Sequence, residues 1–467
     1  MSKKFNNKII LIGFGSIGQA VMPLLIKELG VSSEQIVVIT ADNAGEDVAE
    51  AFNLEVKICA LSQKNYEAVL KEYLTPGNFL INLSVDVSSL ALIKLCQKND
   101  VFYIDTCIEP WKGGYTDLNL EPSERSNYNL REQLLALKKM YPGGATTIVA
   151  HGANPGLVSH FTKRALMTLA EDQDLSGTTP QNAEQWAQLA HDLGVKVIHI
   201  AEKDTQETHV IKKPGEFVNT WSIDGFMSEG LQPAELGWGT HEKQMPKEGV
   251  QHTYGCNAAI YLNRPGLTTR VRTWTPLAGS FHGFLVTHNE SISIADYFSL
   301  KNKDTVIYRP TVHYSYHPSS DAVLSIDEFI GNNFCEPQSK RLLMDEIDHG
   351  KDELGVLLMG HDKKAYWYGS RLSIEEARIL APHNNATSLQ VAAGVLGGIR
   401  WALENPNRGI LEPEELDFEF VLEVASPYLG TLIGVYSDWT PIQNRLQLFS
   451  EDIDYSDPWQ FKNFLVA

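Results

Sequence analysis

The stretch KIILIGFGSIGQAVMPLL, residues 8–25, decides the fold of this chain. Its apolar run at 9–12 leads directly into a G-x-G-x-x-G sequence at 13–18. The apolar residues that follow recur at the 3.6-residue period of a helix, at Ile17, Ala20, Val21, Leu24 and Leu25. A strand, a glycine turn and a helix in this order predict the opening unit of a Rossmann domain that binds a dinucleotide.

Each glycine of this turn has its own physical task. Gly13 permits the tight turn, Gly15 lets a pyrophosphate approach the backbone, and Gly18 lets the helix pack closely on the strand. The free N–H groups at the start of the helix, at Ser16 and Ile17, favour an anion. We therefore predict that these five residues bind the pyrophosphate. The alternative is a glycine turn in a sheet that binds nothing.

Strand-like and helical segments alternate over the first 150 residues. Short apolar runs occur at 8–13, 36–40, 56–61, 78–84, 101–106 and 146–151. Helical patterns lie between them, at 46–52, 66–74, 88–97 and 128–140. Six strands that alternate with helices predict an α/β domain with a doubly wound parallel sheet.

The pattern changes after about residue 155. Helical stretches at 157–170 and 181–193 are followed by strand-like segments at 195–202, 252–262, 280–288, 305–316 and 353–360. This mixture predicts an α+β domain with a mixed, largely antiparallel sheet. Residues 387–403 read as one more helix, rich in small residues. We expect a nucleotide-binding domain over 1–153, a substrate and dimerisation domain over 154–382, and a C-terminal segment over 383–467.

Asp42 follows the second predicted strand, 24 residues after Gly18. A carboxylate at this place binds a ribose 2′-hydroxyl and repels a 2′-phosphate. Residues 41–50 contain no Lys or Arg that would receive that phosphate, so NAD is favoured over NADP. Two alternatives stay open, because Asp42 could cap the next helix and Thr40 could make part of the ribose contact.

Three polar residues end the next two strands of the predicted sheet. Asn82 and Ser84 follow the fourth strand, and Thr106 follows the fifth. The ligand crevice of an open α/β sheet lies outside these carboxyl ends, so all three are candidates for cofactor binding. Each could equally be a turn residue.

Composition and charge narrow the class of partner. Acidic residues outnumber basic ones 58 to 39, for a formal net charge of −19, which argues against nucleic acid or an anionic membrane and is compatible with a cationic substrate. The five cysteines include no C-x-x-C pair, which is typical of reduced thiols in a cytoplasmic protein. No apolar stretch approaches the roughly 18 residues of a membrane helix, so we expect a soluble protein.

Seven segments of the chain match one family together. They are GFGSIGQAVMPLL (13–25), NLSVDVSS (82–89), YIDTCIEPW (103–111), HGANPGLVSHF (151–161), HIAEKDTQ (199–206), NTWSIDGFMSEG (219–230) and NATSLQVAAGVLGGI (385–399). In this order, over essentially the whole chain, they resemble bacterial homospermidine synthase, which is related to saccharopine dehydrogenase-like oxidoreductases. That relation implies a Rossmann domain completed by returning C-terminal helices, with 387–403 as the candidate helix, so we expect the segment 383–467 to pack back on the Rossmann domain.

The resemblance implies a redox-neutral reaction. NAD⁺ takes hydride from one putrescine, ammonia leaves the resulting imine, and a second putrescine condenses at that carbon. The stored NADH then reduces the new Schiff base to homospermidine, so NAD emerges unchanged. The enzyme would be an aminobutyltransferase.

Putrescine is a flexible dication with an apolar middle, so its site needs anions at both ends. By resemblance, Glu202 and Asn154 hold the inner amine near the nicotinamide, and Asp86, Glu109 and Glu229 form an outer cation site. The alternatives are solvated surface carboxylates and, for Asn154, an ordinary helix N-cap.

An aromatic residue and histidines complete the candidates. Trp221 lies in the polar context NTWSIDG, where its ring face could hold an ammonium, although most tryptophans simply pack. His288 could shuttle protons, since imidazole titrates near neutrality, or it could be structural. His313 and His317 have metal spacing only in a helix, and VHYSYHP alternates as a strand does, so we predict no metal.

Two rival functions remain open. A saccharopine or carboxynorspermidine dehydrogenase-like oxidoreductase would need arginine for carboxylate substrates, and Arg270 and Arg272 could supply it. A catalytically silent nucleotide sensor on a Rossmann scaffold is the other rival. We expect a homodimer in each case.

Overall fold

Six N-terminal strands and one C-terminal strand form a seven-stranded parallel sheet. The computed structural model describes residues 4–175, 177–445 and 449–466. The strands are β1 (Ile9–Ile12), β2 (Ile36–Thr40), β3 (Glu55–Ile58), β4 (Phe79–Asn82), β5 (Phe102–Asp105), β6 (Thr147–Ile148) and β22 (Ile410–Leu411). Their order is β22–β6–β5–β4–β1–β2–β3, which contains the 3-2-1-4-5-6 order of a dinucleotide-binding sheet. The predicted parallel sheet is confirmed.

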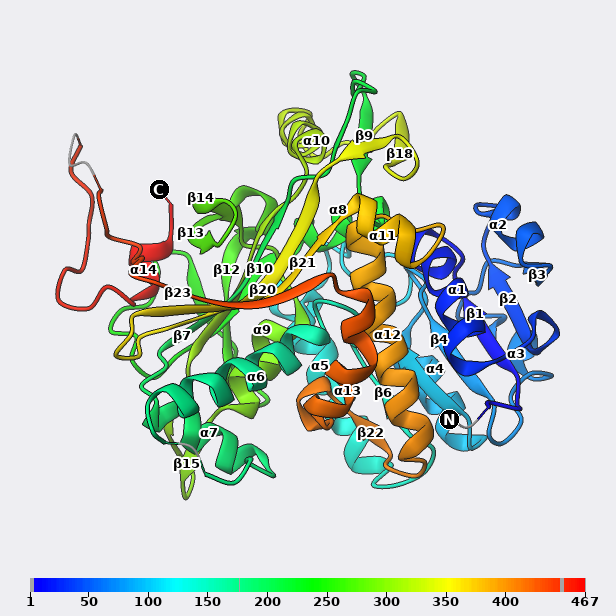
Figure 1. Cartoon of the computed structure of the whole chain (residues 1–467), viewed down its shortest axis with the longest axis horizontal. Coiled ribbons are helices and arrows are strands. Elements are labelled where there is room, and N and C mark those ends of the chain that lie inside the picture. Colours follow the sequence, from blue (N-terminus) through cyan, green and yellow to red (C-terminus); the bar gives the residue numbers. More distant parts are fainter. Residues whose placement is uncertain (1–3, 176, 446–448, 467) are drawn as a thin grey trace.

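Helices cover both faces of this sheet, as Figure 1 shows on its right side. They include α1 (Ser16–Leu29), α2 (Glu46–Ala51), α3 (Tyr66–Leu70), α4 (Ser89–Lys98) and α5 (Asn127–Met140). Side chains alternate along a strand, so Ile9 and Leu11 join one buried cluster whereas Ile10 and Ile12 join another. The continuous apolar run in β1 therefore reflects a strand that is buried on both faces.

The second sheet has ten strands and is mixed but largely antiparallel, as predicted. Its strands are β7 (Val197–Asp204), β10 (Pro233–Gly237), β11 (Gly249–Gln251), β12 (Ala259–Pro265), β13 (Arg270–Thr275), β14 (Gly279–Phe284), β17 (Thr311–His317), β20 (Lys351–Met359), β21 (Ala365–Ser373) and β23 (Thr431–Ser437). The order is β11–β12–β10–β17–β7–β20–β21–β23, and the β13–β14 hairpin joins at β17. Only the β7–β17 pair is parallel among the described strands of this sheet.

Further helices and short ribbons surround the second sheet. The helices are α6 (Leu157–Asp172), α7 (Ala183–Asp192), α8 (Ile223–Leu231), α9 (Asn289–Tyr297), α10 (Ser320–Gly331) and α11 (Ile374–Leu380). The ribbons pair β8 (Glu207–Thr208) with β19 (Ile347–His349), β9 (Glu216–Asn219) with β18 (Ser339–Leu342), and β15 (Leu300–Asn302) with β16 (Thr305–Tyr308). In Figure 1, α10, β9 and β18 stand above the sheet as an arm.

The C-terminal segment returns to the Rossmann domain with its first part. Helix α12 (Ala386–Glu404) packs along α1, and α13 (Phe418–Ala425) packs on α12. Strand β22 extends the parallel sheet beside β6, so the expected return is confirmed. Small residues permit this approach, because a Cβ on Gly394 would lie 2.0 Å from the Gly152 carbonyl oxygen.

The rest of that segment belongs to the second sheet. Strand β23 pairs with β21, and α14 (Phe461–Phe464) packs against β13. Residues 383–467 were expected to pack on the Rossmann domain, but β23 and the buried aromatic side chains after it have their partners on the second sheet. These aromatic side chains are Trp439, Trp459, Phe461 and Phe464.

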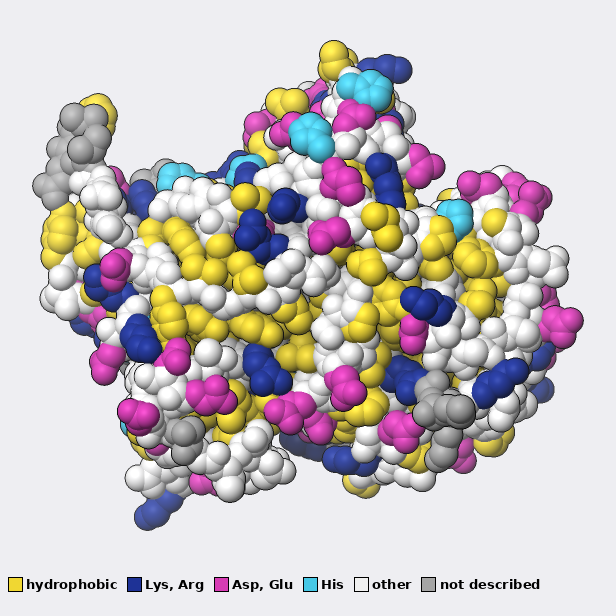
Figure 2. All heavy atoms as spheres, viewed as in Figure 1, with side chains coloured by type: hydrophobic (Ala, Val, Ile, Leu, Met, Phe, Trp, Pro, Cys, Tyr) yellow, Lys and Arg dark blue, Asp and Glu magenta, His cyan; other side chains and the backbone are white. Residues whose placement is uncertain are grey.

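Three further features concern membrane-spanning helices, cysteines and the distribution of charged side chains. No helix in the described ranges has the length and hydropathy that crossing a membrane requires. The five cysteines are free thiols. On the face drawn in Figure 2, Lys and Arg side chains lie scattered among Asp and Glu.

Candidate active site

The glycine turn has the form that a pyrophosphate needs. Gly13 has a φ of +86°, and a Cβ there would lie 2.7 Å from the Leu83 carbonyl oxygen. A Cβ on Gly18 would lie 2.5 Å from the Gly13 oxygen, so the helix can pack here only without a side chain. Gly15 faces open space and begins α1 without a side-chain cap. The N–H groups at Ser16 and Ile17 therefore stand at an open helix start that suits an anion.

Asp42 lies exposed after β2, beside a cavity of about 370 Å³. Its Oδ1 accepts a hydrogen bond from the Ala44 N–H (2.9 Å). Helix α2 has Gly45 as its N-cap, so Asp42 is not that cap. Thr40 is buried and lines the same cavity, and both residues stand where the adenosine end of a dinucleotide would lie.

The strand-end residues form two turns at the carboxyl edge of the sheet. Asn82 Oδ1 accepts from the Ser84 hydroxyl (2.5 Å) and from the Ser84 N–H (3.3 Å). Thr106 lies against the turn before Asn154, where a Cβ built on Gly152 would be 3.2 Å from its methyl carbon. The predicted cofactor residues thus border the crevice from neighbouring strands.

Glu109 lies buried beyond the carboxyl end of β5. Its Oε2 accepts from the Asp86 N–H (3.4 Å), and the Cys107 thiol donates to its Oε1 (3.3 Å). Burial, with the charge of Glu229 nearby, raises the pKa of Glu109 to about 8. Burial also raises the pKa of Asp86. The three carboxylates of the predicted outer cation site therefore lie close together.

Glu202 extends from β7 in the second sheet and is buried. Its Oε2 accepts from the Tyr314 hydroxyl (2.5 Å) and from Asn154 Nδ2 (3.0 Å). Burial raises the pKa of Glu202 to about 7, although these hydrogen bonds oppose the shift. Helix α6 begins at Leu157 with Gly156 as its N-cap, so Asn154 does not cap the helix and its amide faces Glu202.

His288 lies between the predicted outer carboxylates and the inner carboxylate, Glu202. Its Nε2 lies 3.1 Å from Glu229 Oε2, and its Nδ1 lies 3.3 Å from Glu290 Oε1. Burial opposes protonation, but the two carboxylates outweigh it and raise the pKa of His288 to about 10. The ring packs against Tyr314, with centroids 4.4 Å apart, and so reaches the partner of Glu202.

Trp221 is half-buried at the start of α8. Its Nε1 donates to the Tyr316 hydroxyl (3.2 Å), and its ring packs against Phe226 with centroids 5.2 Å apart. Tyr316 stacks on Tyr314, the hydroxyl partner of Glu202. The indole is therefore linked to the inner carboxylate through two tyrosines.

Sequence reasoning missed Tyr314, Tyr316, Glu290 and Cys107. The alternation of tyrosines in VHYSYH was a usable signal, since it puts Tyr314 and Tyr316 on one face of β17. His313 points to the other face and packs against His199, with centroids 4.0 Å apart. The described residues contain no group of three or more His, Cys, Asp and Glu side chains that could hold a metal.

The two arginines that the rival function would need have other partners. The Arg272 guanidinium donates to the Leu465 carbonyl (2.8 Å), and Arg270 stacks on the Phe284 ring at 3.2 Å. Within the described ranges, neither forms an ion pair with a carboxylate of the cleft. Carboxylates, amides and aromatic rings line the site, as a cationic substrate would require.

Comparisons with known proteins found matches over nearly the whole chain. The saccharopine dehydrogenase NADP binding domain matches residues 9–149, and the saccharopine dehydrogenase C-terminal domain matches residues 152–436. Homospermidine synthase of Blastochloris viridis is 52% identical over 467 residues, 99% of this chain and 98% of that protein. Homospermidine synthase of Mesorhizobium japonicum is 51% identical over 98% of this chain and 96% of its own length. The crystal structure of the Legionella pneumophila homospermidine synthase in complex with NAD superposes with a TM-score of 0.94 at 48% identity, covering 100% of this chain and 99% of that one.

Proposed function

Because the chain belongs to the homospermidine synthase family, we propose that the cleft between its two sheets binds putrescine beside NAD and carries out the family's reaction there. The chain is an NAD-dependent enzyme that converts two diamine molecules into homospermidine and ammonia. The reaction balances without an external oxidant, since the hydride taken from the first diamine returns to the product. Bound NAD supplies the hydride acceptor and, once reduced, the hydride donor.

We assign the cofactor to the carboxyl edge of the parallel sheet. The open start of α1 supports pyrophosphate binding there, because a side chain on Gly15 would fill the space above the helix. Asp42 would take the ribose hydroxyls with its free oxygen, and Thr40 would line the adenosine end. The full set is Gly13, Gly15, Ser16, Ile17, Gly18, Asp42, Asn82, Ser84 and Thr106.

The inner amine would bind between Glu202 and Asn154. An ammonium must lose a proton before its neighbouring carbon can give up hydride, and Glu202 is suited to accept it because its pKa is about 7. Asn154 and Tyr314 hold the accepting oxygen in place.

The second diamine would enter along Asp86, Glu109 and Glu229. Glu229 is already paired with His288, which the adjacent Glu290 helps to keep protonated. We therefore assign His288 the role of a proton donor held in the cleft rather than a base. The face of Trp221 would hold an ammonium during condensation, since an aromatic ring stabilises a cation without adding a charge.

The observation that best supports this proposal is that Glu109 and Glu202 are buried and form no ion pair with Lys or Arg among the described residues, while His288 pairs with the half-buried Glu229 between them. Incubation with NAD⁺ and putrescine should yield homospermidine and ammonia in equal amounts without steady growth of NADH absorbance. Stoichiometric NADH accumulation would contradict the synthase and support a dehydrogenase. Tight NAD binding without turnover of any amine would support the sensor instead.

We also propose an organisation for the whole protein. A cofactor domain over 1–153, a substrate and dimerisation domain over 154–382, and a connecting segment from 383 follow the change from parallel to mixed sheet. We propose a homodimer, which light scattering tests. We also propose a cytoplasmic location, which five free thiols support and cell fractionation tests.

A further inference from the structure

Asp105 ends β5 and is buried, yet it has no place in the reaction described so far. Its Oδ2 accepts from the Tyr103 hydroxyl (2.7 Å), and its Oδ1 accepts from the Ala150 N–H (2.6 Å). Burial raises its pKa to about 7, against these hydrogen bonds. Among the described residues Asp105 has no cationic partner, so a charge-free residue would be a cheaper choice if packing alone mattered.

Two chains of hydrogen bonds, which we call branches, start at Asp105. The first runs through Tyr103 to Asn82 and Ser84, two of the predicted cofactor-binding residues. The Tyr103 hydroxyl donates its proton to Asp105, so it can only accept from Asn82 Nδ2 (3.3 Å). The remaining oxygen of Asn82 must then face Ser84, whose hydroxyl and N–H both donate to it. The carboxylate thus sets the donor order along the chain, in agreement with the Ser84 N–H, and the two together hold the Asn82 amide in one orientation.

The second branch runs through Ala150 to the turn before Asn154, which with Glu202 forms the predicted inner amine site. Ala150 has a φ of +50°, a conformation that favours glycine, and its N–H is held by Asp105 Oδ1. The next N–H, of His151, donates to the Asp105 carbonyl (2.8 Å). This turn ends at Asn154, whose amide donates to Glu202.

We propose that Asp105 is a positioning residue, which orients Asn82 through Tyr103 and holds the turn before Asn154 through Ala150. The inference rests on the proposed function, because it takes the first turn as cofactor-binding and the second as holding the reacting amine. Asp105 itself touches neither ligand.

Two variants separate the branches. Tyr103→Phe removes the Tyr103 hydroxyl, and with it the hydrogen bonds to Asn82 and to Asp105 Oδ2, but it leaves Asp105 Oδ1 on the Ala150 N–H. The KM for NAD⁺ should therefore rise about tenfold, the effect of one lost hydrogen bond, while kcat changes less than about threefold. In Asp105→Asn the new NH₂ group faces the Tyr103 oxygen, so the hydroxyl proton must turn toward Asn82. It then meets the Asn82 NH₂ group, or, if that amide turns over, the NH₂ group meets the Ser84 N–H, so a hydrogen bond is lost in either orientation. Both branches then suffer, and kcat should fall about tenfold or more besides the rise in KM.

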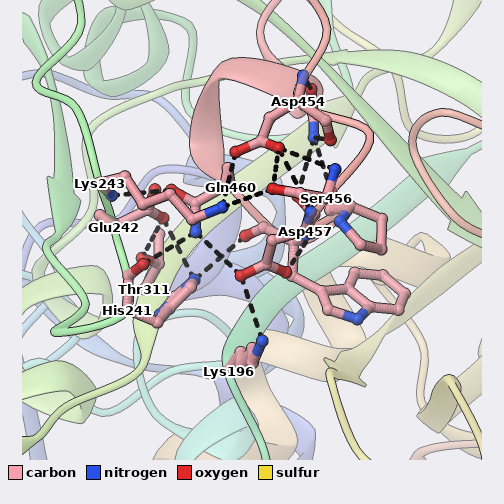
Figure 3. Close-up of polar contacts among 12 residues, drawn as sticks. Lys196, His241, Glu242, Lys243, Thr311, Asp454, Ser456, Asp457 and Gln460 are labelled. Carbon is pink, nitrogen blue, oxygen red and sulfur yellow. Dashed lines mark hydrogen bonds and ion pairs between the residues drawn. The ribbon is translucent and has the colours of Figure 1, made fainter.

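Glu242 offers a matched control in the tail clamp, which we define as Lys196, His241, Glu242, Lys243 and Thr311 with Asp454, Ser456, Asp457 and Gln460 (Figure 3). Glu242 is a buried carboxylate that accepts from one hydroxyl, of Thr311 (2.6 Å), and one backbone N–H, of Phe461 (2.9 Å). Burial raises its pKa to about 7, as for Asp105. Glu242→Gln should leave both KM values and kcat within about twofold of the wild type, although it changes an equally buried carboxylate.

Steady-state kinetics with NAD⁺ and putrescine varied separately, beside melting temperatures of all three variants, test the proposal. A rise in the KM for NAD⁺ in Y103F and a combined KM and kcat effect in D105N, both absent from E242Q, are the expected result. Unchanged kinetics in D105N, or equal losses in E242Q, would overturn the positioning role. A wild-type protein that makes no homospermidine would overturn the proposed function instead.

Discussion

The carboxylates of the tail clamp and those of the cleft differ in what neutralises them. In the tail clamp, Asp457 pairs with Lys196 (3.1 Å) and Asp454 pairs with Lys243 (2.8 Å). Burial opposes ionisation of Asp457, but Lys196 outweighs it and lowers its pKa, and the Lys243 hydrogen bond lowers that of Asp454. These charges are complete within the protein, and they attach the C-terminal segment to the second sheet (Figure 3).

The carboxylates of the cleft, in contrast, are not neutralised by lysine or arginine side chains that the structure describes. Within the described ranges, Glu109 and Glu202 form no ion pair with Lys or Arg, and burial raises their pKa values to about 8 and 7. Fold stability alone would not favour such groups, since an unpaired buried charge is costly. A buried carboxylate without an internal Lys or Arg partner is therefore what a cationic ligand requires, as in Glu109 and Glu202. This property is not sufficient by itself, because Asp105 and Glu242 have raised pKa values as well.

Glu202→Gln should have the largest effect. The amide oxygen can still accept from Tyr314 and Asn154, but the negative charge and the proton-accepting oxygen are lost. We expect kcat to fall about 10²–10³-fold, within the range of a lost general base, with no decrease in melting temperature. Single-turnover NADH formation from putrescine measures the oxidation step directly. Normal hydride transfer in E202Q would remove Glu202 from the inner site.

Trp221 comes next. Trp221→Ala should lower kcat/KM about 30-fold, as expected for a cation contact of roughly 2 kcal/mol, while folding stability changes little. Trp221→Phe should retain more activity, because phenylalanine keeps a weaker ring face and most of the volume.

Trp459, buried beside the tail clamp, is the matched control for Trp221. Trp459→Ala should cost about 3–5 kcal/mol of stability and leave activity per folded molecule unchanged. Kinetics and thermal unfolding of the same samples decide between the roles. A steep fall in the melting temperature of W221A, with normal activity per folded molecule, would place Trp221 with the packing residues.

Much of this site could be predicted because parallel strands bring their carboxyl ends to one edge. Asn82, Asp86 and Glu109 each follow a strand, so their proximity follows from the topology alone. Tyr314 and Glu290 could not be placed in this way. The first depends on the parallel pairing of β17 with β7, and the second lies in the first turn of α9, where acidic residues are common for other reasons.

The tail could not be placed either, for a different physical reason. Residues beyond 437 show neither the period of a helix nor that of a strand, and their aromatic side chains could cover either domain. Their position follows from specific pairs such as Lys196 with Asp457, which lie 261 residues apart in the sequence.

Asp457→Asn should produce a moderate loss of stability and no loss of catalysis. The change removes the charge that Lys196 pairs with, while the amide keeps a hydrogen bond to the tail. We expect a loss of about 1–2 kcal/mol in unfolding free energy, typical of a hydrogen bond to a charged group. Urea unfolding beside steady-state kinetics checks both parts. A loss of turnover at unchanged stability would contradict the division between the two regions.

Proton release on diamine binding should be the smallest effect, and it tests the contrast directly. At pH 7 the free protein holds both Glu109 and Glu202 partly protonated, since burial raises their pKa values to about 8 and 7. An ammonium in the cleft favours the ionised carboxylates, so binding should release protons, and affinity should rise with pH from about 6 until it levels near 8.

The same raised pKa values make folding stability fall, rather than rise, as the pH increases. Both pKa values are raised above the ordinary 4.5, so the stability these groups contribute is fully present below about pH 4.5 and is lost as pH rises through 7 to 8.

Calorimetry measures the proton release on diamine binding when it is done in two buffers of different ionisation enthalpy. Putrescine and NADH are used, because together they provide no hydride acceptor. Glu109→Gln should reduce the release and Asp457→Asn should not. Proton uptake, or equal release in E109Q and the wild type, would mean that the cleft carboxylates are already neutralised within the protein.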